Sequence, residues 1–185
     1  MVASAGRNDK EILQLVHDPA TRERGFELLV RQYQRDVYWL IRRLILDHDD
    51  SDDLTQDTFL KIWNHLDSFR EESGLFTWIY RIATNEALGF LKKKRLKILV
   101  PFPSDPGSLK GSLQNDAFFR GDETELRFQA ALSRLPTKQR LIFQMKYYDE
   151  LTYEKMSEIL GTTTGALKAS FHHAVKKIEK YLTAQ

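Results

Sequence analysis

The stretch from Asp49 to Lys97 constrains the fold most, because it joins two helical patterns of different character. Its first half, DDSDDLTQDTFLKIWNHL, repeats residues of one buried stripe at intervals of four: Leu54, Thr58, Ile62 and Leu66. Carboxylates at its start complement the helix dipole and cap free backbone N–H groups. We therefore predict an amphipathic helix whose opposite face is polar and largely acidic, through Asp53, Gln56, Asp57 and Asn64.

A second helix is predicted from near Phe76, after a turn signal at Ser73 and Gly74. Apolar residues recur along FTWIYRIATNEALGFLKKKR at intervals of three or four and are expected to pack against the first helix. Another side of this helix carries Trp78, Arg81, Asn85 and Gly89, and Tyr80 lies between the two sides. Each aromatic alone is well explained as a core or rim residue. Aromatic rings beside cations and amides can also stack on unpaired bases and hydrogen-bond to them.

The chain before this stretch reads as a short tail and two helices. Residues 1–8 form a loose tail, and a short helix follows from Asp9 to about Asp18. A long helix from about Ala20 has an apolar stripe that suits one member of a helical bundle. The arginines around that stripe are interpreted as a solvated face with no special role: Arg22, Arg24, Arg31, Arg35, Arg42 and Arg43.

Residues 98–122 interrupt the helical pattern. The segment has three prolines, three glycines and no sustained period, so a flexible linker is predicted. The alternative is a surface loop, but a structureless stretch of this length is unusual inside one compact domain. We therefore expect an all-α protein with two small helical domains, an N-terminal bundle over 1–97 and a C-terminal domain over 123–185, joined by this linker.

The C-terminal part has the pattern of a helix-turn-helix. Thr152 is a good N-cap for a helix of about two turns, and Gly161 is placed to end it. Thr163 or Thr164 then caps a long last helix. The exposed side of that helix is basic and polar, through Lys168, Ala169, His172, His173, Lys176, Lys177 and Lys180. A solvated lysine face is the bland interpretation, and insertion into a DNA major groove is the functional one.

Composition restricts the classes of protein. The net charge of +2 is nearly neutral, so nucleic-acid binding depends on how charge is distributed. The absence of cysteine fits a reducing cytoplasm and excludes disulfides and thiolate metal sites. Neither a signal core nor a run of about 20 apolar residues is present. These features predict a soluble cytoplasmic protein without membrane insertion.

DDLTQDTFLKIW, LDSF and FTWIYRIATNEA, followed by the basic run, resemble region two of bacterial RNA polymerase sigma factors of the extracytoplasmic-function group. FELLVRQYQRDVYWLIRRL is similar to the first part of that region. The resemblance implies contacts to core RNA polymerase through Asp53, Gln56, Asp57 and Phe59. It implies promoter melting at the single-stranded downstream (minus ten) element through Arg70, Trp78, Tyr80, Arg81, Asn85, Lys92 and Lys93. In this family an aspartate is common where this chain has Gly89, which leaves the structural role of that position open.

LSRLPTKQRLIFQMKYYDELTYEKMSEILGTTTGALKASFHHAVKKIEKYL resembles region four of the same family. The resemblance implies that duplex DNA of the upstream (minus thirty-five) element is contacted by Thr164, Lys168, Ala169, His172, His173 and Lys176. Many relatives have arginine in place of Ser170 and His173, so the promoter preference does not transfer. An anti-sigma factor is a further partner implied by the family, and no cofactor is expected.

The sequence also bears on two other classes of function. A metal or catalytic site at His48 and the neighbouring aspartates, or at His172 and His173, is disfavoured. Consecutive carboxylates suit a helix start, and adjacent helical histidines point about 100° apart. A two-domain regulator that binds duplex DNA as a dimer is the stronger alternative. It needs neither the acidic face nor the aromatics beside Arg81 and Asn85, so the predicted function is that of a sigma factor and not of an enzyme.

Overall fold

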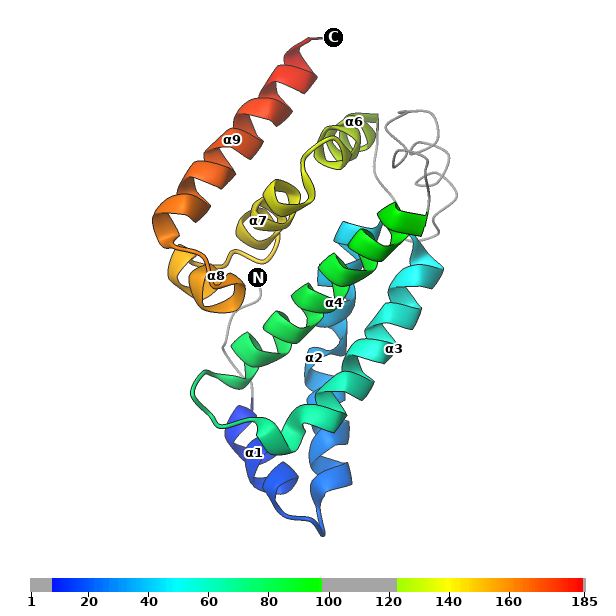
Figure 1. Ribbon diagram of the computed structural model, residues 1–185, viewed down its shortest axis with the longest axis vertical. Helices are drawn as coiled ribbons and strands as arrows, with labels where there is room; N and C mark the ends of the chain where they lie inside the picture. The colour runs from blue at the N-terminus through cyan, green and yellow to red at the C-terminus, as the bar shows by residue number, and fades with distance from the viewer. Residues whose placement is uncertain (1–7, 98–122, 185) are drawn as a thin grey trace.

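The computed structural model describes residues 8–97 and 123–184, and these residues are helical throughout apart from short turns (Figure 1). The predicted all-α fold is confirmed. The predicted linker over 98–122 lies outside the described residues, as does most of the predicted tail. The N-terminal unit contains α1 (Asp9–His17), α2 (Arg22–Ile45), α3 (His48–His65) and α4 (Leu75–Lys97). The C-terminal unit contains α6 (Glu123–Ser133), α7 (Thr137–Tyr147), α8 (Tyr153–Leu160) and α9 (Thr164–Thr183).

The N-terminal unit is built around α2, which packs against α1, α3 and α4. The predicted apolar stripe of α2 is buried as expected, with Tyr33 and Val37 completely inaccessible to solvent. The Tyr33 hydroxyl donates to Asp9 Oδ1 at 2.6 Å, which ties the start of α1 to the middle of α2. Burial of this stripe is the main source of stability, because apolar side chains on several helices leave water together.

Local signals set the ends of α3 and its packing on α4. Asp47 caps α3, since its carboxylate accepts from the Asp50 N–H at 2.9 Å. A 3-10 turn over Leu66–Ser68 follows the helix. Two ion pairs, Lys61 with Glu86 and Lys94 with Asp50, join α3 to α4 on either side of their apolar contact. The carboxylates at the start of α3 therefore serve the structure of the helix.

The C-terminal unit has the predicted helix-turn-helix, formed by α8 and α9. Thr152 accepts from the Lys155 N–H at 3.1 Å and Thr163 from the Ala166 N–H at 3.4 Å, so both helices have the predicted N-caps. Gly161 follows α8 with φ +62° and donates to the Ser157 carbonyl at 2.9 Å. This left-handed conformation disfavours every residue with a Cβ atom.

Gly161→Ala is expected to lower the free energy of unfolding by about 1 kcal/mol, because alanine is strained at a positive φ. Gly165→Ala is the matched control, since Gly165 lies within α9 and a Cβ there meets open space. Thermal unfolding followed by circular dichroism should show a lower midpoint for the first variant and an equal or higher one for the second. Equal midpoints for the two variants would contradict the assigned turn.

The two units pack against each other through a continuous apolar core. Side chains from α7, α8 and the start of α9 belong to the same buried cluster as those of α1 to α4. Met145 and Met156 from the C-terminal unit are completely buried in it. A second, smaller cluster lies inside the C-terminal unit, around Leu132, Phe143 and Ile178. In Figure 1, α8 lies beside the N-terminal half of α4, and α7, which packs against α2, lies between α8 and α6.

Polar contacts also cross this boundary, and they correct the interpretation of the α2 arginines as a solvated face. Arg42 is buried with 6% of its surface exposed. Arg43 Nη1 lies 2.6 Å from Asp149 Oδ1, and its guanidinium lies 4.8 Å above the Tyr148 ring. Burial raises the pKa of the Asp149 carboxyl, while Arg43 acts in the opposite direction. Arg42 is therefore not a solvated residue, and Arg43 links the two units.

Candidate nucleic-acid and protein interface

The polar face of α3 is exposed as predicted. Asp53, Gln56 and Asp57 are all solvent-accessible and are spaced three and four residues apart, so they lie on one side of the helix. Leu60 continues this row and leaves 62% of its surface exposed. An exposed leucine within a row of carboxylates provides a small apolar contact surrounded by negative charge.

Phe59, which was predicted to contact a partner protein, is buried instead with 7% of its surface exposed. It belongs to the main core and lies on the side of α3 that faces the rest of the N-terminal unit. At about 100° per residue, neighbouring positions on a helix point in different directions, and here the apolar side chain that reaches solvent is Leu60. The exposed side chains of this part of α3 are therefore Asp53, Gln56, Asp57 and Leu60.

One side of α4 carries the predicted aromatic and cationic residues. Arg81 and Asn85 are exposed, Trp78 is partly exposed, and the three lie three and four residues apart on one face. The centre of the Trp78 ring lies 5.0 Å from the centre of the Phe69 ring, so the two rings pack against each other. Lys92 and Lys93 are also exposed farther along the helix, and Arg70 is exposed in the loop before it. The face therefore combines positive charge, which attracts phosphates, with an aromatic ring on which an unpaired base can stack.

Tyr80 does not belong to this face. It has no solvent-accessible surface, and its ring lies 4.1 Å from that of Phe76. On a helix with about 100° per residue, position 80 falls inside the buried stripe formed by Ile79, Ala83 and Ala87. Stacking of Tyr80 on a base, which the sequence suggested, is incompatible with this packing.

The exposed side of α9 carries the predicted DNA-contacting residues. Lys168, Ala169, His172, His173 and Lys176 are all exposed, and Thr164 is half-buried in the first turn. Lys168 Nζ lies 5.6 Å from the centre of the Tyr153 ring of α8, which places the lysine head at the junction of the two helices. Leu167 and Ala174 on the opposite side are completely buried, so packing fixes the orientation of the basic face.

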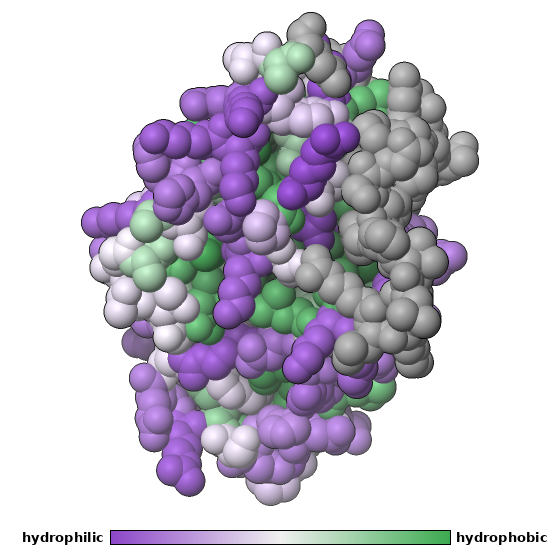
Figure 2. Space-filling model, turned by 45° about the horizontal axis from the view of Figure 1, so that its top comes forward, coloured by the Kyte–Doolittle hydropathy of each residue, from purple (hydrophilic) through white to green (hydrophobic). Residues whose placement is uncertain are grey.

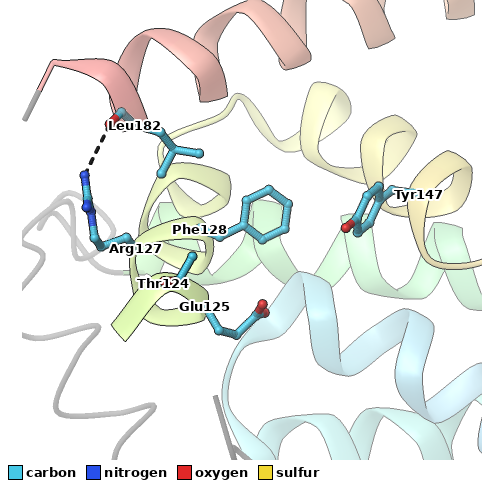
Figure 3. Close-up of a pocket in the computed structure, with 6 residues that line it drawn as sticks. All are labelled: Thr124, Glu125, Arg127, Phe128, Tyr147 and Leu182. Atoms are coloured by element: carbon cyan, nitrogen blue, oxygen red, sulfur yellow. Dashed lines mark hydrogen bonds between the residues drawn. The ribbon is translucent and has the colours of Figure 1, made fainter. Parts of the chain in front are cut away.

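Figure 2 shows a mainly hydrophilic surface in which hydrophobic residues are visible in recesses between polar ridges. A hollow of about 360 Å³ lies between α6, the end of α7 and the end of α9 (Figure 3). Phe128, Tyr147 and Leu182 contribute apolar lining, and Arg127 donates to the Leu182 carbonyl at 3.2 Å. The hollow lies near the C-terminal end of α9, whereas the predicted DNA-contacting residues begin at its N-terminal end.

The histidines do not gather into a metal site within the part of the chain that the structure describes. His48 Nδ1 lies 3.0 Å from the Tyr38 hydroxyl and Nε2 lies 3.4 Å from Asp52, so its ring is engaged at the start of α3. The rings of His172 and His173 lie 6.3 Å apart and are tilted by 50°. Over residues 8–97 and 123–184, none of the helices has the length and apolar character needed to cross a membrane.

The family follows from two matches to family models, one in each unit of the chain. Residues 29–96 match sigma-70 region 2, and residues 125–178 match sigma-70 region 4. The chain belongs to the sigma-70 family, in its extracytoplasmic-function group. As a sigma factor, it directs promoter recognition and the initiation of transcription.

Similarity to known sigma factors extends over most of the chain. The chain is 27% identical to RNA polymerase sigma-H factor of Pseudomonas aeruginosa over 176 residues, which cover 86% of this chain and 87% of that one. It is 28% identical to the ECF RNA polymerase sigma-E factor of Escherichia coli over 168 residues, or 85% and 86% of the two chains. It also resembles the sigma factor RpoE of Bartonella quintana, solved in complex with the anti-sigma factor NepR, with a TM-score of 0.67 and 23% identity over 85% of this chain and 96% of that one.

Sequence reasoning missed two features of this sigma factor. The exposure of Leu60 could have been predicted from the sequence, because Leu60 is an apolar residue within an otherwise polar face of α3. The ion pair of Arg43 and Asp149 could not have been predicted from the sequence, because the two residues are 106 positions apart and belong to different units.

Proposed function

We propose that the two units divide the work of initiation, with 1–97 as region two, 123–185 as region four and 98–122 as the connection between them. Region two binds core RNA polymerase and the opened downstream strand, and region four binds the duplex upstream element. The observation that carries this proposal is the separation of two chemically different exposed faces on adjacent helices of one unit. The acidic face lies on α3, and the face with Trp78, Arg81 and Asn85 lies on α4.

The α3 face suits a basic protein surface. Asp53 and Asp57 supply negative charge, Gln56 supplies hydrogen bonds, and Leu60 supplies apolar area that is not covered by any described part of the chain. Charge complementarity steers encounter, while a central apolar contact reduces dissociation. We propose this face as the docking surface for core RNA polymerase.

Leu60→Glu is expected to weaken the binding of core polymerase by roughly tenfold or more, because it replaces the apolar contact by a charge that must be desolvated. Tyr147→Ala is the control, since Tyr147 is the other large exposed apolar residue among those described and lies on the C-terminal unit. The measurement is competition against labelled unaltered protein for purified core enzyme. Equal affinities of core enzyme for the Leu60→Glu variant and for the unaltered chain would show that Leu60 does not belong to the docking surface.

Region four is proposed to read duplex DNA with the first turns of α9. Lys168 is placed to donate to guanine acceptors and Ala169 to contact a thymine methyl group. His173 and Lys176 lie farther along the exposed side and suit phosphates, which contribute affinity with little sequence information. Specificity then resides in the N-terminal half of the exposed side of α9.

On the α4 face, we propose that Trp78 stacks on an unpaired base and that Arg81 and Asn85 bind the same strand by hydrogen bonds. Lys92, Lys93 and Arg70 supply positive charge along the path of the backbone. Strand opening is then driven by binding free energy, so the chain needs no catalytic residue and no cofactor of its own. Its place of action is the cytoplasm, where the polymerase and promoter DNA are. An anti-sigma factor is a proposed partner, supported by the relative solved with NepR.

Run-off transcription with purified core RNA polymerase of the host and genomic DNA fragments tests the proposed function. The chain is expected to confer initiation at a restricted set of start sites that core enzyme alone does not use. Initiation by the same core preparation with a different sigma factor serves as the control for polymerase activity. Absence of chain-dependent start sites in the presence of that control would contradict the proposal.

A further inference from the structure

We propose that Tyr153 is a positioning residue for base readout. Its ring orients the ammonium group of Lys168 toward the base edges of the upstream element and thereby sets the preference at the base pair that Lys168 contacts. The inference rests on the proposed function, because it explains how one side chain of region four gains specificity. Tyr153 belongs to α8 and not to the exposed side of α9 that is proposed to read DNA.

A lysine on a recognition helix does not read bases by its residue type alone. Its ammonium group is a compact, strongly hydrated charge on a flexible four-carbon chain. Phosphate oxygens attract that charge at every sequence, whereas the base edges carry the sequence information. Lys168 therefore contributes specificity only if its ammonium group is kept near the base edges when α9 enters the major groove.

The Tyr153 ring supplies such a restraint in the free chain. Lys168 Nζ lies 5.6 Å from the centre of that ring, within the range of a cation–π contact. Within residues 8–97 and 123–184, no carboxylate pairs with Lys168, so the ring is the contact that directs its ammonium group. The lysine is exposed, and a cation–π contact at an exposed site is weak. Lys168 is thus oriented without being withheld from DNA.

The Tyr153 ring is itself held in place by α7 and α9. Tyr153 is half-buried and packs against the main core. Phe171 of α9 meets it edge-on, with the ring centres 6.4 Å apart and the planes at 74°. Lys146 Nζ of α7 lies 5.1 Å from the centre of the Tyr153 ring and donates to the Leu151 carbonyl oxygen at 3.1 Å. Packing therefore sets the position of the ring before DNA binds.

Orientation in the free chain reduces the entropy that Lys168 loses when it binds a base. A long side chain that becomes ordered only in the complex loses its rotamer freedom at that moment, which weakens the contact. The contact with Tyr153 lies beside the first turns of α9, the part of a recognition helix that meets base edges. Removal of the ring should therefore lower base discrimination and leave most of the affinity for duplex DNA.

The test uses the full chain with core RNA polymerase of the host and a pool of templates. The upstream element of one chain-dependent start site is randomised, and each template carries a transcribed barcode, so sequencing of transcripts gives the preference at every base pair. Lys168→Ala identifies the pair that Lys168 reads. Tyr153→Leu should reduce the preference for guanine at that pair about fivefold and leave the other pairs unchanged. Tyr153→Phe keeps the ring and should retain the preference.

Two further comparisons separate positioning from a merely structural effect. In the Lys168→Ala background, Tyr153→Leu should cause no additional change of preference, because the ring acts only through the lysine. Tyr181→Leu is the matched control, since Tyr181 is a half-buried tyrosine near the C-terminal end of α9 with the Arg134 guanidinium 4.6 Å from its ring centre. Its loss should leave every base preference unchanged.

Proton NMR of the free chain measures the contact independently of transcription. The ring current of Tyr153 should shift the ε-methylene protons of Lys168 upfield. Tyr153→Leu should abolish this shift, and Tyr153→Phe should retain it. Absence of the shift in the parent chain would overturn the proposal.

The transcription results distinguish the role of Tyr153 from the proposed function. If the parent chain directs chain-dependent start sites and Tyr153→Leu keeps the parent's base preferences, the positioning role is wrong and the proposed function stands. An equal loss of preference in Tyr153→Phe and Tyr153→Leu would also overturn the role of the ring, because the hydroxyl group would then be responsible. If the parent chain directs no start sites, the proposed function fails and base readout by Lys168 fails with it, even where the ring-current shift is present.

Discussion

Trp78→Ala is expected to reduce the fraction of open promoter complexes about tenfold, while the affinity for core RNA polymerase stays unchanged. The ring lies on the exposed face of α4 and is supported by Phe69 at 5.0 Å, so it is held in a fixed position for stacking. Loss of one base–aromatic stack costs about 1–3 kcal/mol. Permanganate reactivity of promoter thymines measures strand opening, and competition for core enzyme measures the affinity.

Two variants separate stacking from other effects of removing a tryptophan. Trp78→Phe keeps an aromatic ring at the same place and should retain most of the permanganate reactivity. Trp39→Ala removes a partly exposed tryptophan from α2, where the ring contacts Tyr38 at 5.4 Å, and should leave strand opening unaffected. If Trp78→Ala opens promoters as well as the parent chain does, the proposed stacking role is wrong.

Much of the fold was predictable because its signals are local. Periodicity identified the buried stripe of α2, and cap residues located α8 and α9. Thr152, Gly161 and Thr163 act on backbone groups within a few residues of themselves, so their roles can be read from their neighbours. The same holds for the exposed rows on α3 and α9, which follow from helix geometry alone.

The errors at the candidate site have a different origin. The family resemblance grouped Tyr80 with Trp78, although the angular position of Tyr80 on α4 places it in the buried stripe. The role of Arg43 was not predictable, because its carboxylate partner lies in the other unit. Contacts between units depend on how two independent surfaces meet, and neither helical period nor capping signals carry that information. The contact between Arg43 and Asp149 is therefore visible only in the folded chain.

A second large effect is expected from Gly25→Ala, which should lower the free energy of unfolding by about 2–3 kcal/mol. A Cβ atom at this position would lie 2.8 Å from the Val16 backbone nitrogen and 2.9 Å from Leu15 Cβ. The first of these atoms is backbone, so it cannot move aside as a flexible side chain does. The substitution therefore forces α1 away from α2, and it should lower the unfolding midpoint by roughly 4–12 °C.

Gly89→Ala provides the matched control for this prediction. Gly89 also lies within a helix of the N-terminal unit, but a Cβ atom there meets open space, so alanine should stabilise the chain by about 0.5–1 kcal/mol. Amide hydrogen exchange should show loss of protection in α1 for Gly25→Ala, because α1 packs on α2 at this glycine. Protection equal to that of the parent chain would show that the two helices tolerate the added methyl group. The same substitution is expected to change the free energy of unfolding in opposite directions at the two helical glycines. Helix propensity is the same at both positions, so the difference measures the close approach of α1 to α2.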